Sequence, residues 1–171
     1  LARIDAHKDA TAWLKRANHR EIGFQFTADH GLQCKCCPDA FGDGLLLDVK
    51  TWSPRGEFTP EAFVREALSR HYLGQLGFYA KGLGETGVKV SQMGFIVVQS
   101  VAPHDVMCIE LSTDAVDFAF GEADDALTTF AEWKGDGAFD EGVAPEVVTM
   151  SLPPWARRGR PVADTDTDAG F

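Results

Sequence analysis

Residues 44–51, GLLLDVKT, constrain the fold of this chain more than any other stretch. The segment is apolar almost throughout, which is typical of a central strand covered on both faces. Asp48 and Lys50 interrupt it, although a buried charge is costly unless it is paired or ligates a metal. Because side chains alternate along a strand, Asp48 and Lys50 share one face. The sequence therefore predicts a buried central strand that carries chemistry on one side.

Hydrophobic periodicity and turn residues predict the elements around this strand. We expect helices and strands in the following ranges: a helix over 4–17, strands over 22–27, 32–39 and 44–51, a helix over 61–81, strands over 92–100 and 106–111, and a helix over 112–134. Thr59 and Pro60 are typical of a helix start, and Gly82 and Gly84 of its end. Gly121 predicts a break in the last helix.

The order of these elements predicts an α/β fold with a mixed central sheet flanked by helices. Consecutive strands joined by short turns over 21–51 are expected to be antiparallel. The helix over 61–81 is long enough to carry the chain across the sheet to the next strand.

The charge distribution is uneven, although the 171-residue chain has a net charge of −10. Residues 1–103 carry 12 Lys or Arg against 11 Asp or Glu, whereas 104–146 carry 12 Asp or Glu against Lys134 alone. The first half is therefore compatible with a polyanionic partner. The acidic stretch predicts a solvated surface that lies away from any such partner.

Four cysteines, at 34, 36, 37 and 108, lack the paired spacing of a zinc or iron–sulfur site. We expect buried free thiols in a reducing cytoplasm. No run approaches the roughly 18 apolar residues of a membrane span. The sequence thus predicts a cytoplasmic protein with no membrane partner. A folded domain is expected over 1–156, and the polar residues 157–171 predict a mobile tail.

Two carboxylates and a lysine converge in the predicted strands. Asp39 ends one strand, and Asp48 follows on the next after eight residues. Carboxylates from adjacent strands can hold a divalent cation through hard oxygen ligands. An ammonium group at Lys50 would neutralise charge that builds on a phosphate, so the set suits metal-assisted phosphodiester hydrolysis. The alternative is a structural ion pair between Asp48 and Lys50.

The spacing of these residues resembles the PD-(D/E)xK nuclease core. Over residues 21–156 the chain is similar in particular to the RecE type, the exodeoxyribonuclease VIII-like nucleases of phages and prophages. Five features carry the resemblance, in the order of that family: the Cys- and Lys-rich strand into Pro38-Asp39, the segment Asp48-Val49-Lys50-Thr51, the pair Gln75-x-x-x-Tyr79, an apolar strand followed by a Pro-bearing loop, and Leu152-Pro153-Pro154-Trp155-Ala156.

The resemblance implies roles for the residues of the core. Asp39 and Asp48 would bind Mg²⁺, with Mn²⁺ as a substitute and the Val49 carbonyl as a further ligand. Lys50 would be the catalytic lysine. Glu21 either completes the metal site or caps the edge of the first strand.

Relatives of this type also carry a metal-binding histidine on an upstream helix, which nothing in this sequence matches. His7 and His19 are expected to lie on the surface, and the matching residue is expected before Leu1.

The resemblance further implies a DNA-contacting surface on the helix over 61–81. Gln75 and Tyr79 match the Q-x-x-x-Y motif of RecB-like nucleases and, being four residues apart, share one helix face. The further expected DNA contacts are Thr51, Arg70, His71 and Lys81. The opposite stripe, with Leu68, Tyr72 and Leu76, is expected in the core. The alternatives are a solvated face and a core position for Tyr79.

The function that the resemblance implies is a Mg²⁺-dependent exonuclease that degrades duplex DNA from its ends, 5′ to 3′, and supplies single strands for recombination. Its implied partners are further copies of itself in a ring, and a single-strand annealing protein. One alternative is a related nuclease that acts on single-stranded ends or flaps, as in CRISPR adaptation. Another is an inactive DNA-binding or assembly module. The complete set of site residues argues against this alternative.

Overall fold

The computed structural model describes residues 2–54, 56–137 and 151. Its helices and strands lie within the first of two units of the chain, residues 1–139. The segment 152–156, the predicted domain end at 156 and the predicted tail over 157–171 lie outside the described residues. No helix in the described part combines the length and apolar character needed to cross a bilayer.

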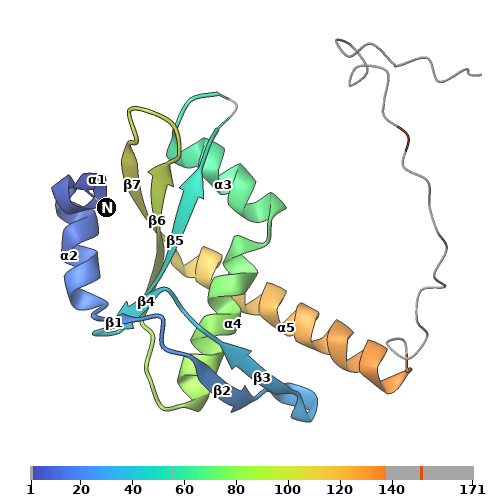
Figure 1. The fold of residues 1–171 in the computed structure, drawn as a ribbon. Helices are drawn as coiled ribbons and strands as arrows, with labels where there is room; N and C mark the ends of the chain where they lie inside the picture. The colour runs from blue at the N-terminus through green and yellow to red at the C-terminus, as the bar shows by residue number, and fades with distance from the viewer. Residues whose placement is uncertain (1, 55, 138–150, 152–171) are drawn as a thin grey trace, which may run out of the picture. The chain divides into compact units, whose positions relative to one another are not determined.

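A five-stranded mixed sheet forms the centre of the fold (Figure 1). Its strands, in spatial order, are β1 (His19–Arg20), β4 (Ala40–Gly42), β5 (Leu45–Trp52), β6 (Gln92–Gln99) and β7 (Val106–Glu110). Strands β5 and β6 are parallel, and the other neighbours are antiparallel. The prediction of a central, buried strand over 44–51 is confirmed, because β5 lies in the middle of the sheet and its first four residues are buried.

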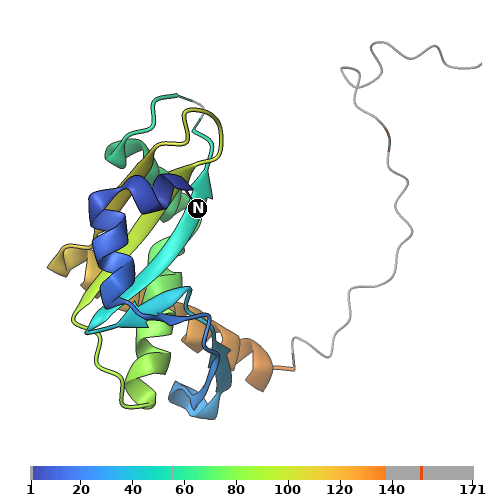
Figure 2. The ribbon, with the colours of Figure 1, turned by 60° about the vertical axis from the view of Figure 1, so that its left-hand side comes forward.

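Helices cover both faces of the sheet, as Figures 1 and 2 show. On one face lie α1 (Ala2–Ala6) and α2 (Lys8–Arg16); on the other lie α3 (Pro60–Ser69), α4 (Tyr72–Glu85) and α5 (Thr113–Gly135). The alternation of β5 divides the core accordingly. Leu45 and Leu47 pack in the cluster beneath α2, whereas Leu46 packs in the cluster with α3, α4 and α5. The predicted mixed sheet flanked by helices is confirmed.

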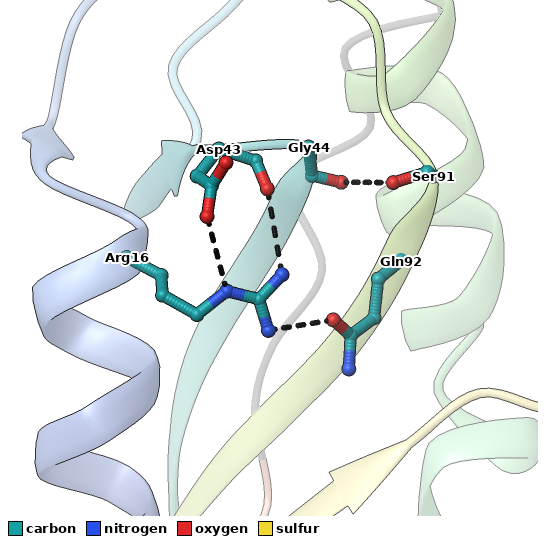
Figure 3. Close-up of polar contacts among 5 residues, drawn as sticks. All are labelled: Arg16, Asp43, Gly44, Ser91 and Gln92. Carbon is teal, nitrogen blue, oxygen red and sulfur yellow. Dashed lines mark hydrogen bonds and ion pairs between the residues drawn. The ribbon is translucent and has the colours of Figure 1, made fainter.

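Polar contacts hold the end of α2 against the sheet (Figure 3). Arg16 Nε lies 3.5 Å from a carboxylate oxygen of Asp43 in the β4–β5 turn, and a guanidinium N–H of Arg16 donates to Gln92 Oε1 over 2.9 Å. The Ser91 hydroxyl donates to the Gly44 carbonyl over 3.3 Å. Because Arg16 and Asp43 are exposed, their ion pair adds little to the stability of the fold. Its role is to orient the end of α2 on the sheet.

A separate hairpin of β2 (Phe24–Thr27) and β3 (Gln33–Cys36) packs against α4. Its buried side chains, Phe26 and Cys36, approach the helix at Gly82. A Cβ atom at Gly82 would lie 2.7 Å from Cys36 Sγ and from Phe26 Cε1, so only glycine permits this approach. The antiparallel pairing predicted for this region is confirmed, but the hairpin forms its own small sheet rather than joining the central one.

Two predicted helices are each divided. The helix predicted over 4–17 is two helices that meet at His7, whose Nδ1 accepts a hydrogen bond from the Ala10 N–H over 3.2 Å and so caps α2. The helix predicted over 61–81 is interrupted at Arg70 and His71, where His71 has a positive φ of 55°. A left-handed residue cannot continue a helix, so the chain changes direction there.

Three glycines that predicted helix ends or breaks lie inside helices. Helix α4 continues through Gly82 and Gly84 to Glu85, and α5 runs unbroken through Gly121. Packing outweighs the modest cost of glycine in a helix, about 1 kcal/mol relative to alanine. The predicted break at Gly121 is therefore wrong.

Candidate active site

The side chains of Asp48 and Lys50 lie on the α4 side of β5, as the alternation predicted. Asp48 is buried, with 2% of its surface exposed, and its Oδ2 lies 2.7 Å from Lys50 Nζ. Apart from this ion contact, Asp48 Oδ2 finds no hydrogen-bond partner among the described residues. Burial raises the pKa of Asp48, the Lys50 ammonium opposes that shift, and the negative charge of Asp39 adds to it.

Lys50 is held by three groups at once. Besides the Asp48 carboxylate, its Nζ donates to Gln75 Oε1 over 2.8 Å and lies 4.3 Å from the centre of the Tyr72 ring. The amide of Gln75 in turn donates to the Tyr79 hydroxyl over 2.7 Å. A continuous polar chain therefore runs from Asp48 on β5 to Tyr79 on α4. The predicted shared helix face of Gln75 and Tyr79 is thereby confirmed.

Asp39 lies just before β4 and reaches across to β5. Its Oδ2 accepts the Val49 N–H over 2.7 Å, and its carbonyl accepts the Glu21 N–H over 3.2 Å. The first bond places the Asp39 carboxylate beside the peptide bond between Asp48 and Val49. This agrees with the effect of the Asp39 charge on the pKa of Asp48.

These residues fit a divalent cation. Asp39 and Asp48 supply hard carboxylate oxygens, and the buried Asp48 carboxylate, whose Oδ2 has Lys50 as its one described partner, would gain from a further ligand. Glu21 is exposed, and no three His, Cys, Asp or Glu side chains among the described residues gather closely enough to hold a metal. The two aspartates are thus candidate ligands, and their metal-binding role, like that of Glu21 and the Val49 carbonyl, stays a prediction.

Two of the predicted DNA contacts at the α3–α4 junction already have acidic partners. Arg70 forms an exposed ion pair with Glu66 one turn earlier. His71 Nδ1 lies 2.7 Å from Glu122 Oε1 of α5, and the other oxygen of Glu122 accepts the Gly74 N–H over 2.9 Å. The His71 carbonyl accepts the Gln75 N–H over 3.1 Å, but the side chains of Arg70 and His71 are engaged by these acids.

Lys81 and Thr51, two further predicted DNA contacts, also point elsewhere. Lys81 Nζ lies 2.6 Å from Asp124 and 3.6 Å from Asp29, and the hydrogen bond to Asp124 raises the pKa of Lys81. Thr51 follows Lys50 on β5, so alternation directs its side chain to the opposite face of the sheet. Their DNA contacts stay predictions, now without support from proximity to Lys50.

Sequence reasoning missed two residues that shape the site. Tyr72 was assigned to the core, yet its ring also faces the Lys50 ammonium, as its place three residues before Gln75 on α4 could have suggested. Glu122 sits on α5 and caps the beginning of α4, which carries Gln75. No local pattern reveals this contact, because 48 residues separate Glu122 from Gly74.

All four cysteines lie in the described part of the chain and are free, as predicted. Burial raises the pKa of Cys36 and of Cys108 to about 11. Of the four, Cys36 is buried, Cys34 and Cys108 are half-buried, and Cys37 is exposed, so the prediction of buried thiols is confirmed for Cys36 and wrong for Cys37.

Comparison with known families agrees with this geometry. Residues 2–138 match the family described as a PDDEXK-like domain of unknown function, DUF3799. The chain belongs to this family. The match spans the candidate site residues on β5 and α4 and confirms the PD-(D/E)xK fold that the sequence predicted, whereas it leaves the RecE type undecided. No curated protein matches the chain in sequence.

The chain also aligns with solved structures, and one alignment supports the same fold. A candidate exonuclease from Eubacterium rectale aligns with a TM-score of 0.57 and 15% sequence identity, over 86% of this chain and 60% of the other. The chain thus spans less than two thirds of that protein. The alkaline exonuclease LHK-Exo of Laribacter hongkongensis aligns with a TM-score of 0.35 and 15% identity, over 82% of this chain and 73% of the other.

Proposed function

We propose that this protein is a metal-dependent deoxyribonuclease that hydrolyses phosphodiester bonds. The observation that carries the proposal is the position of Lys50, whose ammonium group lies between the buried Asp48 carboxylate and the Gln75 amide. A lysine fixed in this way beside two convergent aspartates is suited to a reaction in which negative charge grows on a phosphate. Membership of a PDDEXK-like family supports the same chemistry.

In this proposal each residue of the site has a separate role. Asp39 and Asp48 would hold Mg²⁺ or Mn²⁺, and the bound ion would supply Lewis-acid assistance to water and phosphate. Lys50 would neutralise charge on the phosphate oxygens. Gln75 and Tyr79 would keep the lysine in place and contact the DNA strand beside it.

The finer proposal is an exonuclease of the RecE type, which degrades duplex ends 5′ to 3′ to supply single strands for recombination. A ring-shaped homo-oligomer and a single-strand annealing partner belong to the same proposal. The resemblance of the sequence motifs supports it. The second candidate, a nuclease for single-stranded ends or flaps, uses the same site and differs only in substrate.

A cleavage assay on linear and circular DNA tests the proposal. We expect the chain to degrade linear duplex DNA in Mg²⁺ or Mn²⁺, to leave closed circles intact, and to lose activity in EDTA. Label release from 5′ and 3′ ends gives the polarity, and single-stranded and flap substrates test the second candidate. Absence of metal-dependent cleavage of any substrate would mean that the protein is an inactive DNA-binding or assembly module.

Calorimetry tests the metal site separately. Asp39→Asn and Asp48→Asn should each weaken Mg²⁺ or Mn²⁺ binding at least about tenfold, because an amide oxygen is a poorer ligand for a hard cation than a carboxylate. The matched control is Asp9→Asn, which removes an exposed carboxylate of α2 on the other face of the sheet. Equal binding by all three variants would show that the assigned site is wrong.

A further inference from the structure

A groove runs between the β2–β3 hairpin and α4. Its walls include Gln25 of β2, Lys35 of β3, Cys37 just beyond that strand, and Phe78 and Tyr79 of α4. Gln25 and Lys35 are cross-strand partners in the hairpin. The groove is therefore built by the same two elements that lead into the catalytic set, the segment before Asp39 and the helix that carries Gln75.

Both sides of this groove adjoin the proposed active site. The hydroxyl of Tyr79 accepts the hydrogen bond from Gln75, and Gln75 holds the Lys50 ammonium. On the hairpin side, Cys37 lies two residues before Asp39, whose carboxylate accepts the Val49 N–H. A polymer that lies in the groove would therefore contact Tyr79, which two hydrogen bonds link to the Lys50 ammonium.

The charge of the groove distinguishes it from its surroundings. Lys35 is exposed and makes no ion pair with any carboxylate in the described residues, and no Asp or Glu lines the groove. Each of four other grooves in the described part of the chain includes at least one carboxylate, namely Glu85, Asp105, Asp114 or Glu132. In a chain with a net charge of −10, a groove with a cation and no anion suits a polyanion.

The uncharged walls suit a nucleic-acid strand in particular. The half-buried rings of Phe78 and Tyr79 offer surfaces on which bases stack, and Lys35 offers a contact for phosphate. Lys81 and Arg70, by contrast, are already occupied by Asp124 and Glu66. Lys35 is therefore better placed than either of them to attract DNA.

We propose that this groove binds the nucleic-acid strand adjacent to the phosphate under attack, with Lys35 as its cationic contact. The inference rests on the proposed nuclease function and extends it to a substrate-binding surface. In this proposal the main phosphate contact is Lys35 of the hairpin, in place of the predicted Lys81 and Arg70.

The test is DNA binding in EDTA, at several salt concentrations, to a labelled single-stranded oligonucleotide and its duplex. Loss of one phosphate contact reduces the slope of log affinity against log salt by about one and weakens binding up to about tenfold near 0.1 M salt. We expect Lys35→Ala to show both effects, Lys35→Glu a larger loss, and Lys35→Arg affinity close to that of the wild type.

The matched control is Lys15→Ala, which removes an exposed lysine of α2 on the opposite face of the sheet. Thermal unfolding checks that every variant is folded. If Lys35→Ala and Lys35→Glu bind DNA like Lys15→Ala while the wild type cleaves DNA, the groove assignment is wrong and the nuclease function stands. If the wild type neither binds nor cleaves DNA, both proposals are wrong.

Discussion

Lys50 and Gln75 come from different elements of the fold, a central strand and a covering helix, and meet through a hydrogen bond of 2.8 Å. The bond joins the sheet side of the candidate active site to its helix side. Anything that moves α4 relative to β5 changes the position of the lysine ammonium. The site is therefore sensitive both to its own residues and to the contacts that place the helix.

We predict that Lys50→Ala lowers the cleavage rate at least about a hundredfold, because it removes the cation that would meet charge on the phosphate. Metal binding should persist, since Lys50 is not a ligand. Single-turnover cleavage and calorimetry measure the two properties, with Lys15→Ala as the exposed-lysine control. If folded Lys50→Ala cleaves DNA at the wild-type rate and has only lost thermal stability, the Asp48–Lys50 contact is a structural ion pair.

Gln75 and Tyr79 should behave as one unit. Gln75→Ala breaks the polar chain at its centre, and Tyr79→Phe removes only the hydroxyl at its end. Residues in one hydrogen-bonded network are not additive, so the double variant should cleave only slightly more slowly than Gln75→Ala. Single-turnover rates of the two single variants and the double variant give the coupling. Simple multiplication of the two single effects would show that Tyr79 acts independently of Gln75.

Glu122 should stabilise the fold by capping α4 from a neighbouring helix. Its carboxylate accepts the Gly74 N–H, and a negative charge at a helix N-terminus is favourable. We expect Glu122→Ala to lower the free energy of unfolding by about 1 kcal/mol and the melting temperature by about 2–4 °C. The control is Asp125→Asn, an exposed acid on the same helix. Equal melting curves for the two variants would contradict a capping role.

Two glycines of α4 should respond in opposite ways to alanine. A Cβ at Gly77 would overlap the Ala119 carbonyl oxygen of α5, whereas a Cβ at Gly84 would meet nothing within 4 Å. Gly77→Ala should therefore destabilise the protein by about 1–3 kcal/mol or more, through forced separation of the helices. Gly84→Ala should stabilise it by up to about 1 kcal/mol, through helix propensity. Urea unfolding measures both, and destabilisation by both variants to the same extent would contradict the role of Gly77 in helix contact.

Much of this architecture could be predicted because the relevant signals are local. The apolar run of β5 with charges on one face, and the four-residue spacing of Gln75 and Tyr79, each follow from the geometry of a single element. The interruption at His71 could not be predicted in this way. Glu122 of α5, which contacts both His71 and the first turn of α4, lies far away in the sequence.

The availability of the lysines and arginines for DNA could not be predicted from local sequence either. Sequence reasoning selected Lys81 and Arg70 by their place near the Gln75 helix face. Their acidic partners decide how available they are, and Asp124 reaches Lys81 from a distant part of the chain. The place of Lys35 in a groove likewise depends on the packing of the hairpin against α4, which no local pattern predicts.

The close approach at Gly82 has a consequence for comparing this chain with others. A Cβ there would lie 2.7 Å from Cys36 Sγ and from Phe26 Cε1, so these side chains or the hairpin that carries them would have to shift. The hairpin also leads directly into Pro38 and Asp39, so its displacement would alter the candidate metal site. In an aligned protein, glycine at this one position would be a marker that the hairpin is docked and the aspartate in place. A bulky residue there would require the hairpin, and with it Asp39, to be arranged differently from this structure.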